Sequence, residues 1–387
     1  MVKEALRIRP SMTREEALKR ARALGDMVAA YAQEAEQLRR IPLPVVKAVM
    51  ESGLMPLVRA PYWSGYGLDW AAFTDCLCEI GRSSGSIAWC VGFLFHHQWV
   101  LGHFPQAGQA LVFQTDADPK IATSFAVSGQ AEPTTGGFRV SGEWAFASGC
   151  DHCDWAIVGA AVPGSGPRFM LLKPGQYSIR DTWHSVGLKG SGSNNIVVKD
   201  ALVTEECTLE LGAFYSGHSP GSKFLDGPLY QTTPAAQFQF GLLVPMLAIA
   251  RGAHENSLEF NRNRITGIVG GRASEDPFVQ ARLGESSAEI STAYALLDRI
   301  NQGILSGRYR TPADAAEVGR DFAMIGRLLL SSVDRLFEIS GARGLSESNP
   351  VGRHWRDVHA ITHHVALNID GMFQAYGRHL FAAGAKS

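Results

Sequence analysis

The chain has 387 residues, 45% of them hydrophobic and 19% charged, with a formal net charge of −1. This length allows roughly two or three domains, and the balanced charge gives no field that would favour nucleic acid or an anionic membrane. No apolar run approaches the roughly 18 residues of a membrane span and no signal peptide is recognisable, so we expect a soluble, cytoplasmic protein.

The first part of the chain, residues 1–117, is predicted to be mostly helical. Thr13 followed by Glu16 matches a capping box, which marks the start of a helix. A second helix is expected around Val49. Residues 70–104 should be helical again, with an interruption at a turn that contains serine and glycine. We therefore predict an N-terminal helical domain.

The middle part, residues 118–225, is predicted to contain strands over roughly 119–206. Apolar and polar residues alternate there with a period of two, which is typical of half-buried strands. The residues expected to share one face are Phe138, Val140, Trp144 and Phe146. A turn rich in glycine and serine, residues 188–194, precedes another β run. We predict a small β-barrel domain.

The last part of the chain, residues 226–387, has the pattern of long amphipathic helices. The expected helices cover residues 235–266, 276–306, 311–340 and 351–384. Together these patterns predict an α+β fold with an N-terminal helical domain, a central β-barrel domain and a C-terminal four-helix bundle.

This order of elements resembles the acyl-CoA dehydrogenase fold over nearly the whole chain. The resemblance also rests on Gly-Tyr-Gly-Leu-Asp at residues 65–69 and on a C-terminal run. The residues of that run that match the family pattern are Gly341, Pro350, Val351, Arg353, Arg356 and Asp357. Each motif is weak alone, but the set is specific.

The chain departs from the dehydrogenases where a base is expected. In one common branch of that family, a glutamate after the Arg-Asp motif takes the α-proton of a thioester. Here residues 362–366 read Thr-His-His-Val-Ala, without an acid. This late histidine and three further segments resemble a different branch, the two-component, reduced-flavin-dependent monooxygenases. The segments are GRSSGSIAW (81–89), FASGCDHCDW (146–155) and DTWHSVGLKGSGSN (181–194).

The resemblance implies an oxygenase component that uses reduced flavin and O2. A separate NAD(P)H:flavin reductase would supply reduced FMN (FMNH2) or FADH2, and a C4a-hydroperoxyflavin would hydroxylate a small aromatic substrate, phenol- or indole-like. The absence of a GxGxxG motif at a strand–helix junction agrees with nicotinamide binding to another protein. The resemblance also implies a homotetramer, a dimer of dimers.

Three alternatives stay open. An N-oxygenase acting on an amine or amino sugar would use the same flavin site. An FAD-dependent acyl-CoA dehydrogenase would need a well-placed glutamate elsewhere. A non-catalytic protein of this fold would have no affinity for flavin in either redox state.

Five residues are candidates for holding the flavin. By resemblance, the Ser148 hydroxyl bonds flavin N5, whereas the alternative is a serine in an ordinary turn. Trp144 and Trp183 are candidates to wall the ring, or else belong to the strand core. Ser124 lies where the fold's first flavin-contacting strand is expected. Arg264 aligns with an arginine that reaches flavin phosphate across a subunit interface, although the Phe-Gly that follows it in dehydrogenases is missing here.

His364 is the candidate catalytic acid or base. An imidazole can take a phenol or indole proton at neutral pH or hydrogen-bond a peroxide oxygen. Its neighbour His363 is the rival, because within a helix the two side chains would point about 100° apart.

A second group of candidates lies in the helical region before the strands. Trp89 and His97 are eight residues apart, about two helical turns, and are expected to share one face. The resemblance implies that they line the pocket of the aromatic substrate, which His97, as a second catalytic candidate beside His364, would orient or deprotonate. His96 is the rival of His97. Phe240 is expected to contribute an aromatic wall to the same pocket.

The motif Cys150-Asp151-His152-Cys153 looks like a metal or redox site but lacks a second ligand pair and a helix N-terminus. We therefore expect no metal. The six cysteines are too sparse for a disulfide framework.

Overall fold

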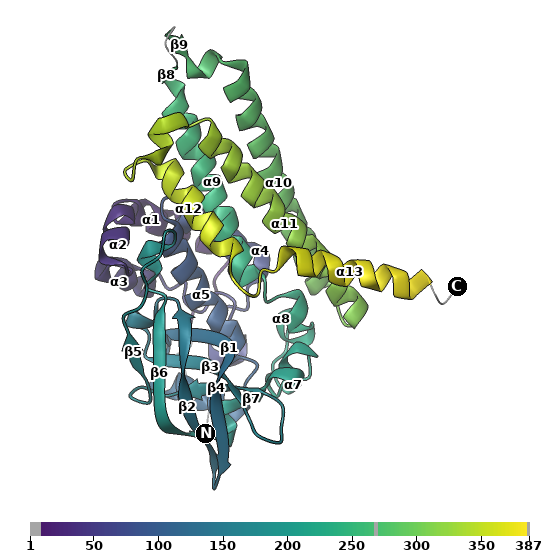
Figure 1. Ribbon diagram of the computed structural model, residues 1–387. Helices are drawn as coiled ribbons and strands as arrows, with labels where there is room; N and C mark the ends of the chain where they lie inside the picture. Colours follow the sequence, from purple (N-terminus) through teal and green to yellow (C-terminus); the bar gives the residue numbers. More distant parts are fainter. Residues whose placement is uncertain (1–8, 267–269, 385–387) are drawn as a thin grey trace.

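The computed structural model describes residues 9–266 and 270–384. A helical region, a β-sheet and a helical bundle follow one another along the chain, and the N-terminal helices lie beside both the sheet and the bundle (Figure 1). The α+β class is thus confirmed, while the limits of the three predicted domains stay predictions. The helices before the sheet are α1 (Arg14–Ala29), α2 (Ala32–Leu38), α3 (Leu43–Glu51), α4 (Trp70–Gly81), α5 (Gly85–Leu101) and α6 (Gln106–Thr115).

Side-chain caps fix where these helices begin. The Thr13 hydroxyl accepts the N–H of Glu16 at the start of α1, as predicted. The Asp69 carboxylate caps α4 in the same way, and the Ser84 hydroxyl caps α5. The break between α4 and α5 therefore follows from local sequence, and it lets α5 run as a separate buried helix.

The strands form one seven-stranded sheet in the order β5-β6-β2-β1-β3-β4-β7. Neighbours are antiparallel except for β1 and β3, which are parallel. The strands are β1 (Ile121–Thr134), β2 (Gly137–Ala147), β3 (Trp155–Ala161), β4 (Arg168–Leu172), β5 (Ser178–Arg180), β6 (Asn194–Thr204) and β7 (Thr208–Glu210). Short helices α7 (Leu211–Tyr215) and α8 (Pro228–Gln231) lead to the bundle.

The predicted alternation along β2 is wrong at Phe146. The pairing of β2 with β6 shifts register between Trp144 and Ala147, and Phe146 has a φ of 66°. Such a bulge inserts an extra residue and reverses the face on which the following side chains lie. Trp144 is fully buried, whereas Phe146 is 68% exposed.

The bundle consists of α9 (Phe240–Arg262), α10 (Pro277–Leu305), α11 (Pro312–Glu338), α12 (Pro350–Thr362) and α13 (Ile369–Gly384), with a two-stranded β8–β9 hairpin (Ile265–Thr266 and Gly271–Arg272) after α9. The single helix predicted over 351–384 is wrong, because α12 ends at Thr362 and α13 begins at Ile369. Among the described residues, no helix is long and apolar enough to cross a membrane.

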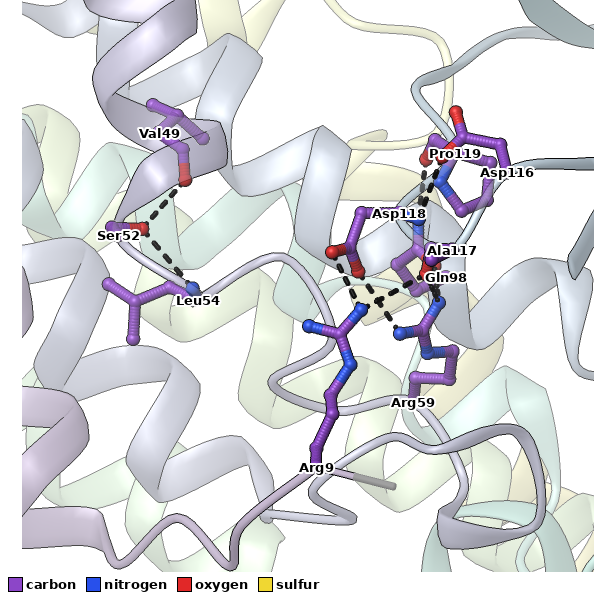
Figure 2. Close-up of polar contacts among 10 residues, drawn as sticks. All are labelled: Arg9, Val49, Ser52, Leu54, Arg59, Gln98, Asp116, Ala117, Asp118 and Pro119. Atoms are coloured by element: carbon purple, nitrogen blue, oxygen red, sulfur yellow. Dashed lines mark hydrogen bonds and ion pairs between the residues drawn. The ribbon is translucent and has the colours of Figure 1, made fainter. Parts of the chain in front are cut away.

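A partly buried ion pair and the side chain of Gln98 on α5 connect α5 to the start of the sheet (Figure 2). The Arg59 guanidinium, which is 1% exposed, donates to the Asp118 carboxylate and to the carbonyl of Ala117. Gln98 on α5 accepts from the same guanidinium and donates to the carbonyl of Pro119, just before β1. Burial lowers the pKa of Arg59 to about 10, so the group stays charged at neutral pH.

A second buried carboxyl connects the bundle to the turn before β6. Asp357 on α12 is 1% exposed and accepts the N–H of Leu188 at 2.6 Å. A Cβ added at Gly85 would lie 2.3 Å from a carboxylate oxygen of Asp357, so the first residue of α5 has to be glycine for the carboxyl to fit. One side chain thus contacts α5 and the 188–191 turn from α12.

We predict that Asp357 makes stability depend on pH. Burial raises the pKa of its carboxyl from 3.8 to about 7. Between about pH 4 and pH 7 the folded chain keeps a proton that the unfolded chain releases, so this contribution is complete at the acid end and is lost as pH rises through the window. Urea unfolding of the wild type and of Asp357→Asn, which keeps an acceptor for Leu188, should show it.

In the wild type, the free energy of unfolding should fall between about pH 4 and pH 7 by about 1.4 kcal/mol for each unit of pKa difference, and Asp357→Asn should not show this fall. Parallel pH profiles for the two proteins would contradict the prediction.

Candidate active site

Three aromatic side chains at four-residue intervals form one stripe along α5. The Trp89 and Phe93 ring centroids are 4.5 Å apart, and the Phe93 and His97 rings stack at 5.0 Å. The predicted shared face of Trp89 and His97 is confirmed. His96 lies on another face, against Trp70 and near Phe238, so it is His97 that faces the strands.

The Ser148 hydroxyl lies at the N-terminal end of this stripe. The indole N–H of Trp89 donates to Ser148 Oγ at 2.9 Å, and Ser193 Oγ lies 2.8 Å from the same oxygen. Ser148 and Phe93 also line one small pocket. The structure therefore brings Ser148, Trp89 and His97 to one region, as the sequence predicted.

The meeting of Ser148 and Ser193 follows from strand register. Ala147 at the end of β2 is paired with Asn194 at the start of β6. In an antiparallel pair the next residues outward face each other, and these are Ser148 and Ser193. Behind them, the fully buried Ser191 places its hydroxyl 2.6 Å from that of Ser193.

Phe146 and Trp183 lie next to each other, with ring centroids 6.1 Å apart and ring planes at 82°, and Phe146 comes two residues before Ser148 in the chain. Trp183 is half-buried; its indole N–H donates to the Leu188 carbonyl and its backbone N–H donates to the Asn194 side chain. A planar ring with a hydrogen-bonding edge, which is the shape of a flavin, can stack on one of these two rings and meet the other edge-on. Phe146 was missed as a candidate because its outward position depends on the bulge.

His97 is buried and has both ring nitrogens engaged. Nδ1 lies 2.7 Å from the Ile121 carbonyl and so must carry a hydrogen, which leaves Nε2 to accept from the Thr123 hydroxyl at 3.0 Å. Burial lowers the pKa of His97 to about 4, so the ring is neutral at pH 7. Thr123, which the sequence did not indicate, is therefore part of the site.

His364 reaches the site from the turn between α12 and α13. Its ring lies 5.9 Å from that of Trp89, centroid to centroid, whereas His363 is exposed. His364 Nδ1 accepts the N–H of Ala366, so in the neutral ring Nε2 carries the hydrogen. Burial lowers the pKa of His364 to about 4. The imidazole thus presents a hydrogen-bond donor.

Two predicted residues lie in the core instead. Trp144 is fully buried and donates its indole N–H to the Gly159 carbonyl, which corrects its assignment as a flavin wall. Phe240 is also fully buried and stacks on Trp70 inside the bundle interface, away from the α5 stripe. Both side chains follow the strand-core or helix-core alternative that their apolar patterns also allowed.

Ser124 and Arg264 make contacts within the chain. The Ser124 hydroxyl donates to the Ala145 carbonyl and so links β1 to β2 near the bulge. Arg264 donates to the side chain of Asn261 and to the Ile339 carbonyl. Figure 1 places the β8–β9 hairpin, which begins directly after Arg264, at the opposite end of the molecule from the sheet. Arg264 therefore does not join Ser148 within one chain.

The Cys150–Cys153 motif forms a short turn whose side chains bond to backbone. The two thiols face the carbonyls of Gly192 and Gly149, and His152 bonds to the Ile41 carbonyl. Burial raises the pKa of Cys150 to about 12, which disfavours a reactive thiolate. The described part of the chain contains no cluster of three or more His, Cys, Asp or Glu side chains suited to a metal.

Fold and site together define a flavoprotein of the acyl-CoA dehydrogenase fold, and residues 240–369 match the acyl-CoA dehydrogenase C-terminal domain family. The chain is 33% identical over 359 residues to the flavin-dependent monooxygenase oxygenase subunit HsaA of Rhodococcus jostii RHA1, covering 89% of this chain and 93% of that protein. It is 31% identical to the FADH2-dependent resorcinol hydroxylase oxygenase component of Rhizobium sp. MTP-10005, covering 95% and 94%. The chain belongs to the oxygenase components of flavin-dependent monooxygenases.

Solved structures agree with this assignment. The 3-HSA hydroxylase from Rhodococcus sp. RHA1 superposes with a TM-score of 0.89 at 31% identity, over 95% of this chain and 97% of that one. XiaF from Streptomyces sp., solved in complex with FADH2 and glycerol, has a TM-score of 0.87 at 25% identity, over 95% and 96%. The acyl-CoA dehydrogenase fold predicted from the sequence is thus confirmed.

We predict that His97 and His364 stay neutral well below their ordinary pKa of 6.5, since burial lowers both values to about 4. NMR of protein labelled in its histidine rings should show neither side chain gaining a proton between pH 8 and about pH 5. His97→Gln and His364→Gln variants would assign the two signals. A ring that titrates near pH 6.5 would contradict the prediction for that residue.

Proposed function

We propose that this chain binds reduced flavin on the surface formed by Phe146 and Trp183 and uses it with O2 to hydroxylate an aromatic substrate. The observation that carries the proposal is the position of the Ser148 hydroxyl, which is fixed by Trp89 and lies two residues after Phe146 in the chain. A planar ring stacked there would bring its N5 edge to Ser148. Bound reduced flavin would supply the oxygen-activating chemistry, through the C4a-hydroperoxide that the family resemblance implies.

Ser148 orients the N5 edge of the ring in this proposal. Its hydroxyl has a hydrogen and two lone pairs, and Trp89 and Ser193 occupy only part of this capacity. Trp183 is held by its indole bond to Leu188, so the aromatic surface is formed before any ligand binds. Which flavin is used, FMN or FAD, is left to the binding experiment.

The proposed substrate is a phenol- or indole-like ring that binds against the α5 stripe. Phe93 stacks on His97, and Phe125 lies edge-on to His97 and near Phe238. None of these four side chains is charged at neutral pH, because the low pKa of His97 keeps its imidazole neutral. Such a wall favours an uncharged aromatic ring over an amino sugar or a sugar nucleotide.

His364 and His97 have different proposed tasks. His364 Nε2 has no hydrogen-bond partner among the described residues and is available to a substrate hydroxyl or a peroxide oxygen. His97 is held by Ile121 and Thr123 at both nitrogens and acts by shaping the pocket and orienting the ring. The proposed catalytic group is therefore His364, with Ser148 fixing the flavin.

The partner proteins follow from the same proposal. Because the relatives are oxygenase components, a separate NAD(P)H:flavin reductase would supply the reduced flavin. We also propose a homotetramer. Phe381 on α13 is 85% exposed and Leu380 is 55% exposed. The exposure of these apolar side chains to water is unfavourable, and contact with a neighbouring subunit would bury them. In such an assembly Arg264 would face the flavin of a neighbouring subunit.

The function is tested by a single turnover. The protein is mixed without oxygen with reduced FMN, or FADH2 in parallel, then with air-saturated buffer, and the near-ultraviolet absorbance of a flavin C4a adduct is followed. We expect an adduct whose decay is accelerated by phenol- or indole-like compounds and is coupled to hydroxylated product.

In the same assay His364→Ala should lower coupled hydroxylation by about 10²-fold or more, the usual size of an acid–base contribution. His363→Ala, at the exposed neighbouring position, is the matched control and should be close to wild type. If His363→Ala abolishes coupled hydroxylation and His364→Ala does not, the catalytic group is His363 instead. If both variants keep wild-type activity, neither histidine is the catalytic acid or base. Failure of the wild type to form an adduct would contradict the function itself.

Phe146→Ala tests the aromatic surface. Because Phe146 is 68% exposed, its loss should change the fold little, but it should weaken flavin binding by roughly tenfold, about 1.4 kcal/mol, through lost stacking. Leu202→Ala, at an exposed position on β6 further from Ser148, is the control and should bind as the wild type does. Equal affinities of the two variants, measured by calorimetric titration, would contradict the placement.

A further inference from the structure

His364 lies in a turn that is held to the rest of the chain at few points. Val365 in this turn is 85% exposed, and the carbonyl of His364 accepts the N–H of Leu367, which closes the turn on itself. The buried side chain of Leu367 anchors the turn through apolar contact. Among the described residues, one hydrogen bond reaches the turn from outside the flanking helices. In that bond the side-chain amide of Gln239 donates to the Ala366 carbonyl at 2.8 Å.

Gln239 connects this turn to the aromatic wall of the candidate site. It directly precedes α9, and its own carbonyl accepts two N–H groups in the first turn of that helix, so its backbone is fixed. The preceding residue is Phe238, whose ring centroid lies 5.2 Å from that of Phe125. One short segment therefore carries both a part of the wall and the donor that holds the turn of His364.

The bond to Ala366 bears on the orientation of the imidazole. Ala366 donates its N–H to Nδ1 of His364 at 3.2 Å, so the residue that Gln239 holds is also the residue that orients the ring. Nε2 then carries the hydrogen that faces a ligand. The pKa of His364 is lowered by burial, and no charged side chain contributes to this shift, so the turn keeps the ring away from water.

The other half of the glutamine amide indicates that the contact adds little to stability. Oε1 of Gln239 is buried and has no hydrogen-bond partner among the described residues, and a buried acceptor without a donor costs free energy. An apolar side chain of similar length would avoid this cost but could not hold the Ala366 carbonyl.

We propose that Gln239 is a positioning residue for His364, and that it keeps the imidazole directed at the substrate by holding the Ala366 carbonyl. This inference rests on the proposed function, because that function assigns the catalytic step to His364.

Gln239→Met tests this role, because it replaces the amide by an apolar chain of similar length. The variant loses the donor to Ala366 and also the buried free oxygen, so its Tm should stay within about 3 °C of the wild-type value. Without the donor the turn loosens and water reaches the ring, so the pKa of His364 should rise by about one unit. NMR titration of histidine-labelled protein measures this pKa without any flavin.

The second readout is the single turnover with reduced flavin and O2. The flavin adduct should form as in the wild type, because the surroundings of Ser148 are unchanged, whereas coupled hydroxylation should fall by about tenfold as the imidazole loses its position. Gln239→Ala should act in the same direction if the methionine variant folds badly. Gln231→Met is the matched control. It removes an amide that donates to the carbonyls of Ser222 and Leu225, and it should leave both readouts unchanged.

The two readouts separate the possible failures. If the pKa of His364 is the same in the wild type and in both Gln239 variants, Gln239 does not hold the ring and the inference is overturned. It is also overturned if the pKa rises while coupled hydroxylation stays at the wild-type level. If the wild type forms no adduct, the proposed function fails, and with it the catalytic role of His364, while the titration still decides whether Gln239 holds the turn.

Discussion

The buried carboxyl of Asp357 sets the geometry on which the site depends. It holds the N–H of Leu188 and lies against Gly85, so α12, the turn before β6 and the start of α5 are fixed relative to one another. Each of these segments then delivers part of the site. Trp89 lies one turn into α5, Ser193 follows in the turn, and His364 comes two residues after α12 ends. A single side chain thus fixes the relative positions of residues that are far apart in the sequence.

The parts of the site that the sequence predicted are those set by local rules. Residues four apart in a helix share a face wherever the helix packs, so the stripe through Trp89 and His97 followed from spacing alone. The starts of α1 and α5 followed from capping side chains at Thr13 and Ser84, which act within one turn of the chain. Ser148 was indicated by resemblance.

The parts that the sequence did not predict depend on pairing between distant strands or on chain breaks without a strong signal. The bulge that exposes Phe146 and buries Trp144 arises from the register of β2 against β6, which no pattern within β2 records. The turn that carries His364 contains neither proline nor glycine, and its one signal in this sequence is Asn368, whose side chain accepts the N–H of Gly371 at the start of α13 and which the prediction of a single helix overlooked. Thr123 became visible only through its bond to His97.

The electrostatics of the site explain why so few of its polar groups are free. Burial keeps His97 and His364 neutral, and the contacts with Ile121 and Thr123 occupy both nitrogens of His97. Among the described polar groups next to Trp89, this leaves one unfilled bonding position on Ser148 and one N–H on His364. They lie at different parts of the same indole, which donates to Ser148 and packs edge-on against His364.

Groups that occupy the two positions therefore lie at different parts of the Trp89 indole. In the proposed arrangement the flavin edge meets Ser148 and the oxygen or substrate hydroxyl meets His364. Because neither position carries a charge, each binds its ligand through a directional hydrogen bond and not through long-range electrostatic attraction. A ligand placed outside hydrogen-bonding geometry therefore gains little binding free energy. The fixed indole of Trp89 is then the element that sets the spacing between the two ligands, and the Nε2–H of His364 and the remaining hydrogen-bonding capacity of Ser148 determine which groups bind at the two positions.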